Sequence, residues 1–472
     1  MTAGVFENER KTSIFRNYTR FAVLAISLIC STLLLSNSLA LNFTIICMGS
    51  ENGTSIYDYS SSQQGWLFSV VAIGSLIGSV PIAEGLARFG LRNVKSAYGL
   101  VSGVATILSP LAASMGFYWL LLMRGIQGFA LAAAFPATGA VATSWATLAE
   151  SGTYMALMSC YLQFGPMLTM PVAGAFCVSP IGWSGVYYLQ GFLSLVFFAL
   201  FYYFYRDSPR MHKSVSAKEL GRIEKDKTGI TGKQTNIPYA AISTNITVVG
   251  LWVAILGANA AFQIFLQYGP TYLNKVLHYE VDSTGFATAV PFLLSFITKL
   301  VAGPLCDYAT CVGVRGRIFI FTSVAQATMA ACFVGLALVP TEKAFLGWCA
   351  YALAIVCSGL NCVSLFKCGQ MVSRQFFPFV MSVVAFLCSL NILIVPMFIY
   401  FMAPNNTPEE WALVFYVAAT VTVVSTVVFL AAARSVAPFL ALPTGRASQR
   451  RRSLPDNGAH SVRFFAVISS QR

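Results

Sequence analysis

Long apolar segments follow one another along almost the whole of this 472-residue chain. The hydrocarbon core of a bilayer is about 30 Å thick, and a helix of about 20 apolar residues crosses it. Helices cross lipid in large numbers because they pair their own backbone groups. The sequence therefore predicts an all-α membrane protein with 12 transmembrane helices, at 21–48, 65–87, 94–113, 117–142, 153–177, 183–205, 246–273, 284–306, 317–340, 344–371, 378–402 and 411–433.

The composition excludes most other classes of protein. Hydrophobic residues make up 57% of the chain and charged residues only 10%, against about 25% charged residues in soluble domains. Too few polar residues remain to cover a water-exposed surface, which excludes a soluble enzyme, a disordered protein and a nucleic-acid binder. Most of the 12 cysteines lie inside apolar runs, where cysteine behaves as a small apolar residue. We expect no metal site, no cofactor and no catalytic group.

The basic residues predict how the chain is oriented. With the N-terminus inside, 25 of the 30 Lys and Arg residues fall in cytoplasmic segments, and only Lys275 and Lys343 fall in external loops. Cytoplasmic loops are enriched in Lys and Arg, so both termini are predicted to be cytoplasmic. The net charge of +13 is then a topology signal. The cluster at 450–452 could contact anionic membrane lipid, or it could belong to a solvated tail.

The chain divides into two groups of six spans. The predicted parts are a cytoplasmic tail (1–20), an N-terminal half (21–205), a cytoplasmic linker (206–245), a C-terminal half (246–433) and a basic cytoplasmic tail (434–472). Similar turns, each with a glycine followed by charged residues, follow the second and eighth spans. Parallel six-span repeats are the plan of major facilitator transporters, whose halves rock around a central site. The proposed gating residues are Gly85, Arg88 and Arg92 in the first turn and Gly303, Asp307 and Arg317 in the second.

Three basic residues lie inside predicted spans: Arg124, Lys299 and Lys367. On insertion scales each costs about 2.5–3.5 kcal/mol at the helix centre, and no Asp or Glu lies at the same depth to compensate. A cavity with this balance attracts anions, so we expect a small anionic substrate. Alternatively, Arg124 bonds backbone carbonyls, and the two lysines extend along the helix to the inner surface.

Neutral polar residues inside the spans are further candidates for binding. Asn42 and Asn259, together with Asn37 and Asn361, could coordinate a substrate or Na⁺ through oxygen, or they could bond neighbouring helices. No His, Asp or Glu at mid-depth offers a conventional proton carrier, so the coupling ion, Na⁺ or H⁺, stays open. Asn52 and Asn405 begin glycosylation sequons in external loops, which suit a plasma membrane or a vesicle membrane equally.

Short motifs, taken in their order along the chain, carry a family resemblance over about residues 21–433. The chain resembles the major facilitator family that contains sodium–phosphate cotransporters, sialin and the vesicular glutamate transporters. This resemblance implies transport of phosphate or an organic anion, driven by Na⁺, protons or membrane potential, with Arg124 contacting the substrate. The matching segments include Arg124-Gly-Ile-Gln-Gly128, Trp145-Ala146, Glu150-Ser151, Gly182-Trp183, Asp207-Ser-Pro209, His212, Ser216, Glu219, Pro270-x-Tyr272 and Glu409-Glu410-Trp411.

The chain departs from the glutamate-transporting members at three positions. Ala40 and Ala258 stand where those members carry arginines in spans one and seven, and Leu131 replaces a fourth-span glutamate linked to proton coupling. We therefore expect a monomeric secondary active transporter for an organic anion or inorganic phosphate, working by alternating access with spans one, four, seven and ten along the path. The alternatives are a facilitator for a neutral solute, with structural basic residues, and a transporter-like receptor that moves nothing.

Overall fold

A computed structural model describes residues 17–48, 59–147, 150–225, 242–308, 314–340, 343–373 and 376–434. Helices are the regular elements of these ranges. Those before the linker are α1 (Thr19–Met48), α2 (Ser61–Met115), α3 (Phe117–Leu131), α4 (Ala134–Trp145), α5 (Ser151–Met158), α6 (Tyr161–Cys177) and α7 (Ser184–Phe204). We call these seven helices the N-terminal half.

The linker contributes a single 3-10 turn, η1 (Pro209–Met211), and the short helix α8 (Ala217–Glu224). The remaining helices form what we call the C-terminal half. They are α10 (Ile246–Lys275), α11 (Val281–Tyr308), α12 (Val314–Leu338), α13 (Ala344–Ser373), α14 (Phe377–Met402) and α15 (Pro408–Arg434).

All twelve predicted spans lie in helices, which confirms the all-α membrane fold. Eleven helical segments among the described residues are long and apolar enough to cross a membrane. The second and third spans are joined in α2 across Gly90, whose φ of +76° is non-helical. The fifth span is instead divided into α5 and α6 on either side of Ser159 and Cys160, and neither piece is among these eleven segments.

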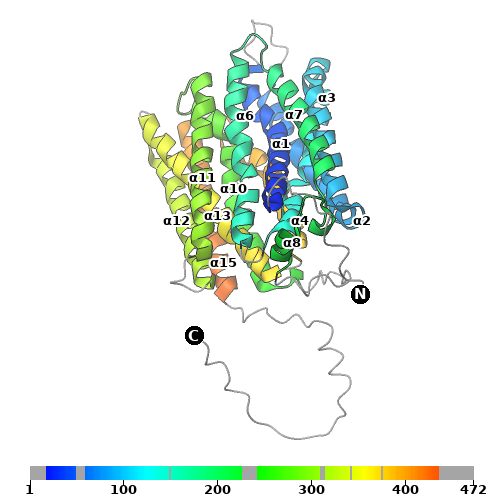
Figure 1. Cartoon of the computed structure of the whole chain (residues 1–472). Coiled ribbons are helices and arrows are strands. Elements are labelled where there is room, and N and C mark those ends of the chain that lie inside the picture. Colours follow the sequence, from blue (N-terminus) through cyan, green and yellow to red (C-terminus); the bar gives the residue numbers. More distant parts are fainter. Residues whose placement is uncertain are drawn as a thin grey trace, which may run out of the picture. The chain divides into compact units, whose positions relative to one another are not determined.

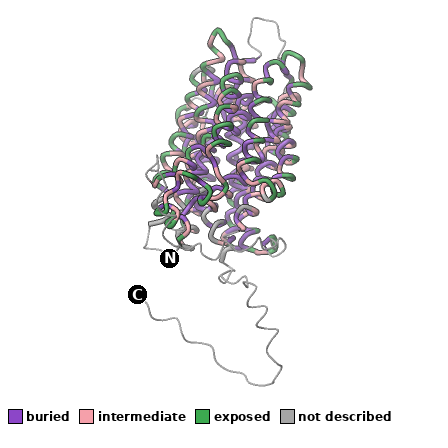
Figure 2. The backbone as a smooth tube through the Cα atoms, turned by 45° about the vertical axis from the view of Figure 1, so that its right-hand side comes forward, coloured by how far each residue is buried: buried purple, intermediate pink, exposed green. Residues whose placement is uncertain are grey.

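Helices of the two halves pack against each other along the bundle. In Figure 1, α6 runs beside α11, with α10 and α1 next to them. The contact between α6 and α11 is one of the two most extensive contacts between the halves. The second such pair is α2 with α14. Buried residues fill the interior and exposed residues face outward (Figure 2). Exposed residues include large apolar side chains such as Phe192, Phe345 and Phe401, as expected for a surface that meets lipid.

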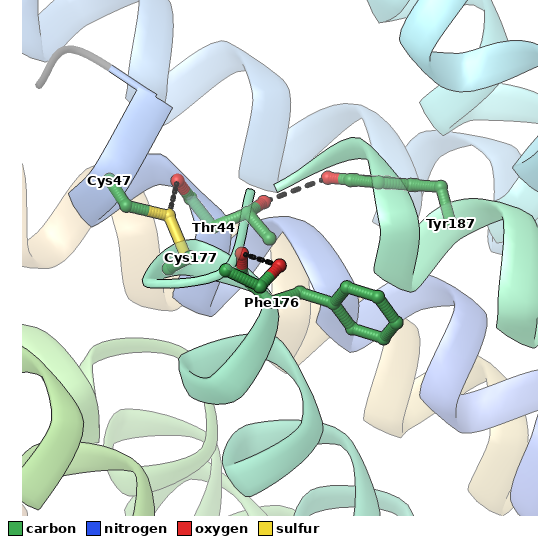
Figure 3. The surroundings of a disulfide bond; sticks show 6 residues. Thr44, Cys47, Phe176, Cys177 and Tyr187 are labelled. Atoms are coloured by element: carbon green, nitrogen blue, oxygen red, sulfur yellow. Dashed lines mark hydrogen bonds between the residues drawn. A yellow bond between two sulfur atoms is a disulfide. The ribbon is translucent and has the colours of Figure 1, made fainter. Parts of the chain in front are cut away.

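A disulfide that the sequence analysis did not predict joins the ends of two helices. Cys47 in the last turn of α1 is bonded to Cys177 at the end of α6 (Figure 3). Beside it, the hydroxyl groups of Thr44 and Tyr187 lie 2.9 Å apart and link α1 to α7. These contacts tie α1, α6 and α7 together at one end of the N-terminal half.

The linker is docked on the N-terminal half at the opposite end of α1. Ser216 caps the start of α8, because its hydroxyl accepts a hydrogen bond from the backbone of Glu219. The buried carboxylate of Glu219 in turn accepts a hydrogen bond of 2.9 Å from the backbone N–H of Arg20. The Glu219 carboxylate of α8 thus lies at the N-terminus of α1, where a negative charge is favourable. This contact fixes α8 to the start of α1.

Candidate functional site

A small cavity lies between the two halves. Its walls come from α4 and α6 on one side and from α10, α13 and α14 on the other. The space open to the centre of a water molecule is about 30 Å³, enough for about two waters. In this structure the free space is thus too small for a larger solute. The lining residues are Phe135, Leu162, Gln163, Ile255, Ala258, Asn259, Phe262, Ser358, Asn361, Leu365, Phe366, Val384 and Cys388.

The cavity carries a few polar groups on apolar walls. Asn361 on α13 is only 1% exposed, and neither its Nδ2 nor its Oδ1 has a hydrogen-bond partner among the described residues. Asn259 on α10 is bonded, since its Oδ1 accepts from Nδ2 of Asn391 at 3.2 Å. Leaving a buried polar group unsatisfied costs about 1–3 kcal/mol. Such a group in a cavity marks a place where a ligand or water can bind.

Lys299 on α11 reaches across the interface to the N-terminal half. Its side chain is fully buried, and its Nζ donates to Oε1 of Gln163 at 2.8 Å and to Oγ and the carbonyl oxygen of Ser159 at 3.2 and 3.4 Å. The interruption between α5 and α6 places Ser159 there, and Gln163 itself lines the cavity. The structure thus puts Lys299 beside the cavity, in the packed contact between the two halves.

Arg124 on α3 is also buried, but it does not line the cavity. It donates to the carbonyl oxygens of Ser38 at 2.6 Å and Leu67 at 3.3 Å, and to Oε1 of Gln127 at 3.1 Å. Gln127 is in turn held by Thr106 at 3.0 Å. Arg124 therefore joins α1, α2 and α3 inside the N-terminal half. The backbone carbonyls foreseen as the alternative to a substrate are its partners here.

A further buried cation, Lys95, was missed by the sequence analysis. Lys95 is 0% exposed, and its Nζ donates to the carbonyl oxygen of Ser27 at 3.0 Å and the hydroxyl of Ser31 at 2.9 Å. The charge count given above includes it among the 25 cytoplasmic basic residues, although it lies inside the predicted run 94–113. The run boundary was the available signal, because a lysine inside a span is normally buried or functional.

These cations have neutral partners. In the described residues, the hydrogen bonds of Lys95, Arg124 and Lys299 all end on carbonyl, hydroxyl or amide oxygens. The ion pairs that the structure does contain, such as Arg20 with Glu150, lie elsewhere. The positive charges of Lys95, Arg124 and Lys299 are thus not compensated by an acidic side chain among their described hydrogen-bond partners. No group of three metal-binding side chains occurs within the described ranges.

The predicted gating turn after the second span is built around a different glycine. Gly90, with its positive φ, makes the turn, and a Cβ there would lie 2.5 Å from the carboxylate of Asp207. Arg92 joins the turn to the linker and α7, through its backbone N–H to Asp207 and its Nε to the carbonyl of Tyr202 at 2.6 Å. Gly85 has only ordinary contacts there, and exposed Arg88 pairs with the nearby Glu84.

Other predicted residues are placed only in part. Asn42 is buried in α1 and is not among the lining residues of the cavity. Asn405 is exposed, and its Nδ2 donates to Glu410 at 3.0 Å. Asn52 lies outside the described residues. The side chains of Asp307, Arg317 and Lys367 and the surroundings of Gly303 also lie outside the description, although the backbone is helical at all four positions.

Comparison with known proteins gives a consistent family match. A family model described as Major Facilitator Superfamily matches residues 21–372. Human sialin is 24% identical over 79% of this chain and 76% of its own length. Mouse sodium-dependent phosphate transport protein 3 is 25% identical over 54% of this chain and 53% of its own length.

Solved structures show the same fold at low identity. The xylose transporter XylE from E. coli, in a partially occluded inward-open conformation, is 14% identical with a TM-score of 0.66, over 86% of this chain and 96% of that one. A bacterial homologue of the human lysosomal transporter Spinster, inward-facing and occupied, gives 14% identity and a TM-score of 0.60, over 90% and 99% of the two chains.

Proposed function

The chain belongs to the Major Facilitator Superfamily, and on this premise we propose that it is a secondary active transporter of an organic anion or inorganic phosphate. Both the family and the fold are those of multi-pass membrane transporters and not of enzymes. The observation that carries the proposal is Lys299, a buried cation at the border of the central cavity with no acidic partner among its described contacts. An anion entering the cavity would supply the missing negative charge.

The cavity offers polar groups from both halves to such a ligand. Gln163 comes from α6, and Asn259 and Asn361 come from α10 and α13. Spans four, seven and ten supply lining residues, as expected for the path, and span one does not. Asn361 has both a donor and an acceptor to offer, so it suits a ligand that carries oxygens beside its charge.

Alternating access is supported by contacts between the halves at two levels of the bundle. On the predicted external side, the rings of Phe68 in α2 and Tyr268 in α10 lie 5.6 Å apart. On the predicted cytoplasmic side, Lys299 bonds Ser159 and Gln163. Since the space open to water holds only about two molecules, we expect the halves to separate at one level or the other when a solute enters.

The names of the relatives also favour an anion. They include sodium-dependent phosphate transport proteins from human and from mouse. For this chain, phosphate and organic anions are both part of the proposal, as are both termini in the cytoplasm and a plasma or vesicle membrane.

The test is uptake by the purified protein in proteoliposomes. The probes are radiolabelled phosphate, glutamate and gluconate, with labelled glucose as a neutral comparison, and exchange against unlabelled solute detects transport without any driving force. We expect exchange of at least one anion and none of glucose. Imposing Na⁺, pH and voltage gradients one at a time then identifies the driving force. Exchange of glucose with no exchange of the anions would contradict the proposal.

A neutral-solute facilitator is the second candidate. It is favoured by one specific observation, namely that Arg124 and Lys299 both have neutral oxygen partners in the closed structure and so do not require a ligand. The same panel separates the two functions, because a facilitator for neutral solutes would transport independently of membrane voltage. Binding of a probe without any exchange would instead indicate a transporter-like receptor.

A further inference from the structure

We propose that a sterol binds in a groove on the lipid-facing side of the protein, between α2 and α14 at their predicted external ends. The groove is separate from the central cavity and takes one wall from each half. The inference concerns the lipid around the protein and does not depend on which solute the protein carries.

The groove is open toward lipid and larger than the central cavity. The space open to the centre of a water molecule is about 300 Å³, against about 30 Å³ in the central cavity. Among its lining side chains, Trp66 on α2 is 55% exposed, and Met397 and Phe401 on α14 are 54% and 74% exposed. In a bilayer these apolar side chains meet lipid, so a lipid molecule can reach the groove along its open side.

Each wall of the groove is a single stripe of residues along a helix. The stripe on α2 runs from Ser62 to Ile73 and that on α14 from Leu393 to Phe401, with lining residues repeated every three or four positions. The rise from Ser62 to Ile73 is about 17 Å, close to half of the roughly 30 Å hydrocarbon core. The groove thus runs parallel to the helices and matches a lipid that occupies one leaflet.

The groove ends where the two helices meet. Ser75 on α2 and Ser389 on α14 are buried, and their hydroxyl oxygens lie 2.7 Å apart. Both lie just beyond the inner lining residues Ile73 and Leu393. The two helices are therefore in direct contact near the middle of the membrane and leave the groove between them toward the predicted external surface.

The polarity of the lining suits a ligand with one hydroxyl group at its outer end. At the mouth, exposed Ser62 and half-exposed Tyr400 carry hydroxyl groups, which both donate and accept hydrogen bonds. At the inner end, Ile73 and Leu393 are apolar. Between these levels the polar lining residue is Ser69, which is buried. A sterol has this arrangement, with one hydroxyl group above a rigid apolar body.

The charges near the mouth favour a neutral lipid over a phospholipid. The sequence has no Lys or Arg in residues 21–87 or 375–433, so the external ends of α2 and α14 and the loops next to them carry no cation. The helix after α14 instead begins with the acidic residues Glu409 and Glu410. Basic residues are what attract anionic lipid headgroups. A phosphate would find no such partner in these segments, whereas a sterol carries no charge.

A sterol in this groove contacts both halves of the protein. The wall on α2 belongs to the N-terminal half and the wall on α14 to the C-terminal half. In alternating access the halves move relative to each other, so the groove keeps this shape only while the external ends of α2 and α14 stay together. The sterol therefore binds this arrangement best and stabilises it.

The test is photolabelling in proteoliposomes of phosphatidylcholine. A cholesterol analogue with a photoreactive diazirine on its ring system is cross-linked to the wild-type protein, and labelled peptides are identified by mass spectrometry. We expect labels in 62–73 and 393–401 that an excess of unlabelled cholesterol removes. Labels spread evenly over the lipid-facing helices would overturn the proposal. So would preferential labelling of the same residues by a phosphatidylcholine with a photoreactive acyl chain, which would identify a phospholipid as the occupant.

Two glycines provide a matched pair of variants. A Cβ at Gly65, which lines the groove, would meet nothing within 4 Å, and the same is true of Gly335 on α12. Gly65→Phe therefore fills the groove without a backbone clash, and Gly335→Phe adds the same side chain elsewhere. Gly65→Phe should lower the labelling of the groove by about tenfold, because the ring takes the space of the ligand. Equal labelling of the two variants would contradict a site at this place.

A stability measurement gives a second readout and shows whether the variants fold. In phosphatidylcholine nanodiscs, added cholesterol should raise the thermal midpoint of the wild-type protein and of Gly335→Phe, because a ligand that binds the folded state stabilises it. It should not raise that of Gly65→Phe. The same increase in all three proteins would show that cholesterol acts through the bilayer and not through the groove. If Gly65→Phe does not fold, the competition experiment on the wild-type protein decides the question.

Discussion

Individual polar residues in the interior differ in whether their hydrogen bonds are made. Asn361 and Asn391 are both buried amides in the C-terminal half. Asn391 donates to the carbonyl of Leu256 at 2.9 Å and to Asn259, whereas neither side-chain polar atom of Asn361 is bonded within the part of the chain that the structure describes. A buried group that costs stability and faces a cavity is more consistent with binding than with folding.

We predict that Asn361→Leu stabilises the empty protein and reduces anion exchange. The substitution removes two unsatisfied polar atoms and should raise the free energy of unfolding by about 1–3 kcal/mol, visible as a higher thermal midpoint in detergent. Exchange should fall at least tenfold. Asn391→Leu is the matched control and should lower the midpoint. A lower midpoint for Asn361→Leu would show that the amide has a structural partner.

Arg124 permits a second prediction at the same scale. Arg124→Ala should abolish anion exchange while the protein still reaches the membrane, and it should lower the thermal midpoint. The reason is that Ser38, Leu67 and Gln127 lose a charged donor, and each such bond contributes about 1.5–3 kcal/mol. Arg124→Lys shows whether the positive charge alone is sufficient, because lysine keeps the charge but lacks the planar, forked arrangement of donors of the guanidinium group. Undiminished exchange in Arg124→Ala would rule out any essential role.

Among the helices, close approach of backbones determines how the N-terminal half packs. Gly74 on α2 lies against α3, where an added Cβ would fall 2.0 Å from the carbonyl oxygen of Gly125. Gly128 on α3 faces α2 in the same way, 2.0 Å from the carbonyl oxygen of Val71. Small residues permit such contact between membrane helices, so the α2–α3 pair depends on these glycines.

We therefore expect Gly74→Ala to destabilise the protein strongly. The added methyl group meets backbone atoms, which cannot rotate away, and overpacking of this kind costs about 1–3 kcal/mol or more. Yield of monodisperse protein and thermal midpoint are the measurements. Gly335→Ala on α12, where a Cβ meets nothing within 4 Å, is the control and should be neutral or stabilising. Equal behaviour of the two variants would contradict the packing argument.

The docked linker is an element whose stability should depend on pH. His212 packs edge-on against Trp145, with ring centres 5.6 Å apart, and its Nδ1 accepts a hydrogen bond from the backbone of Ser214 at 3.2 Å. Burial, and next the positive charge of Arg206, lower the pKa of His212 below its usual 6.5. The docked linker thus prefers the neutral imidazole.

The pH prediction follows from that direction. A histidine whose pKa is lowered on folding contributes its stability fully above pH 6.5, and this contribution is lost as the pH falls through the lower pKa of the folded state. The thermal midpoint of the wild-type protein should thus fall below pH 6.5 more steeply than that of His212→Gln. Parallel profiles between pH 8 and pH 5 would show that His212 does not control docking.

At the scale of the whole molecule, the position of the disulfide can be compared with the orientation that the charges predict. Cys47 and Cys177 lie at the ends of α1 and α6, which are external if the N-terminus is cytoplasmic. Disulfides persist outside the reducing cytosol. The charge distribution and the disulfide, two independent features, therefore favour the same topology.

We predict that an impermeant reductant followed by an impermeant maleimide labels this pair from outside intact cells. If the protein lies in a vesicle membrane, the same reagents should label the pair from the lumenal face. The variant Cys47→Ser/Cys177→Ser should not be labelled, and it should lose roughly 2–4 kcal/mol of unfolding free energy, as typical disulfides contribute. Labelling that requires permeabilised cells would place this end of α1 inside and reverse the topology.

Features that depend on local composition were readable from the residues alone. The twelve spans, the family and the excess of basic over acidic residues inside the membrane follow from runs of about 20 residues, because transfer into lipid is decided residue by residue. The same local logic explains why Arg124 and Lys299 were found. Lys95 was missed although it lies within a predicted span, because it is only one residue from the start of that span and its charge was counted as cytoplasmic.

Pairing between distant residues required the folded chain. Whether Lys299 reaches Gln163, whether Asn361 stays unbonded and whether Cys47 meets Cys177 depend on the rotation of helices that are more than 100 residues apart or on opposite sides of a cavity. A turn of one helix by a single residue, about 100°, would redirect these side chains without altering the hydropathy of any span. Hydropathy thus accounts for the membrane fold, and helix packing alone decides which buried charges and amides remain available to a solute.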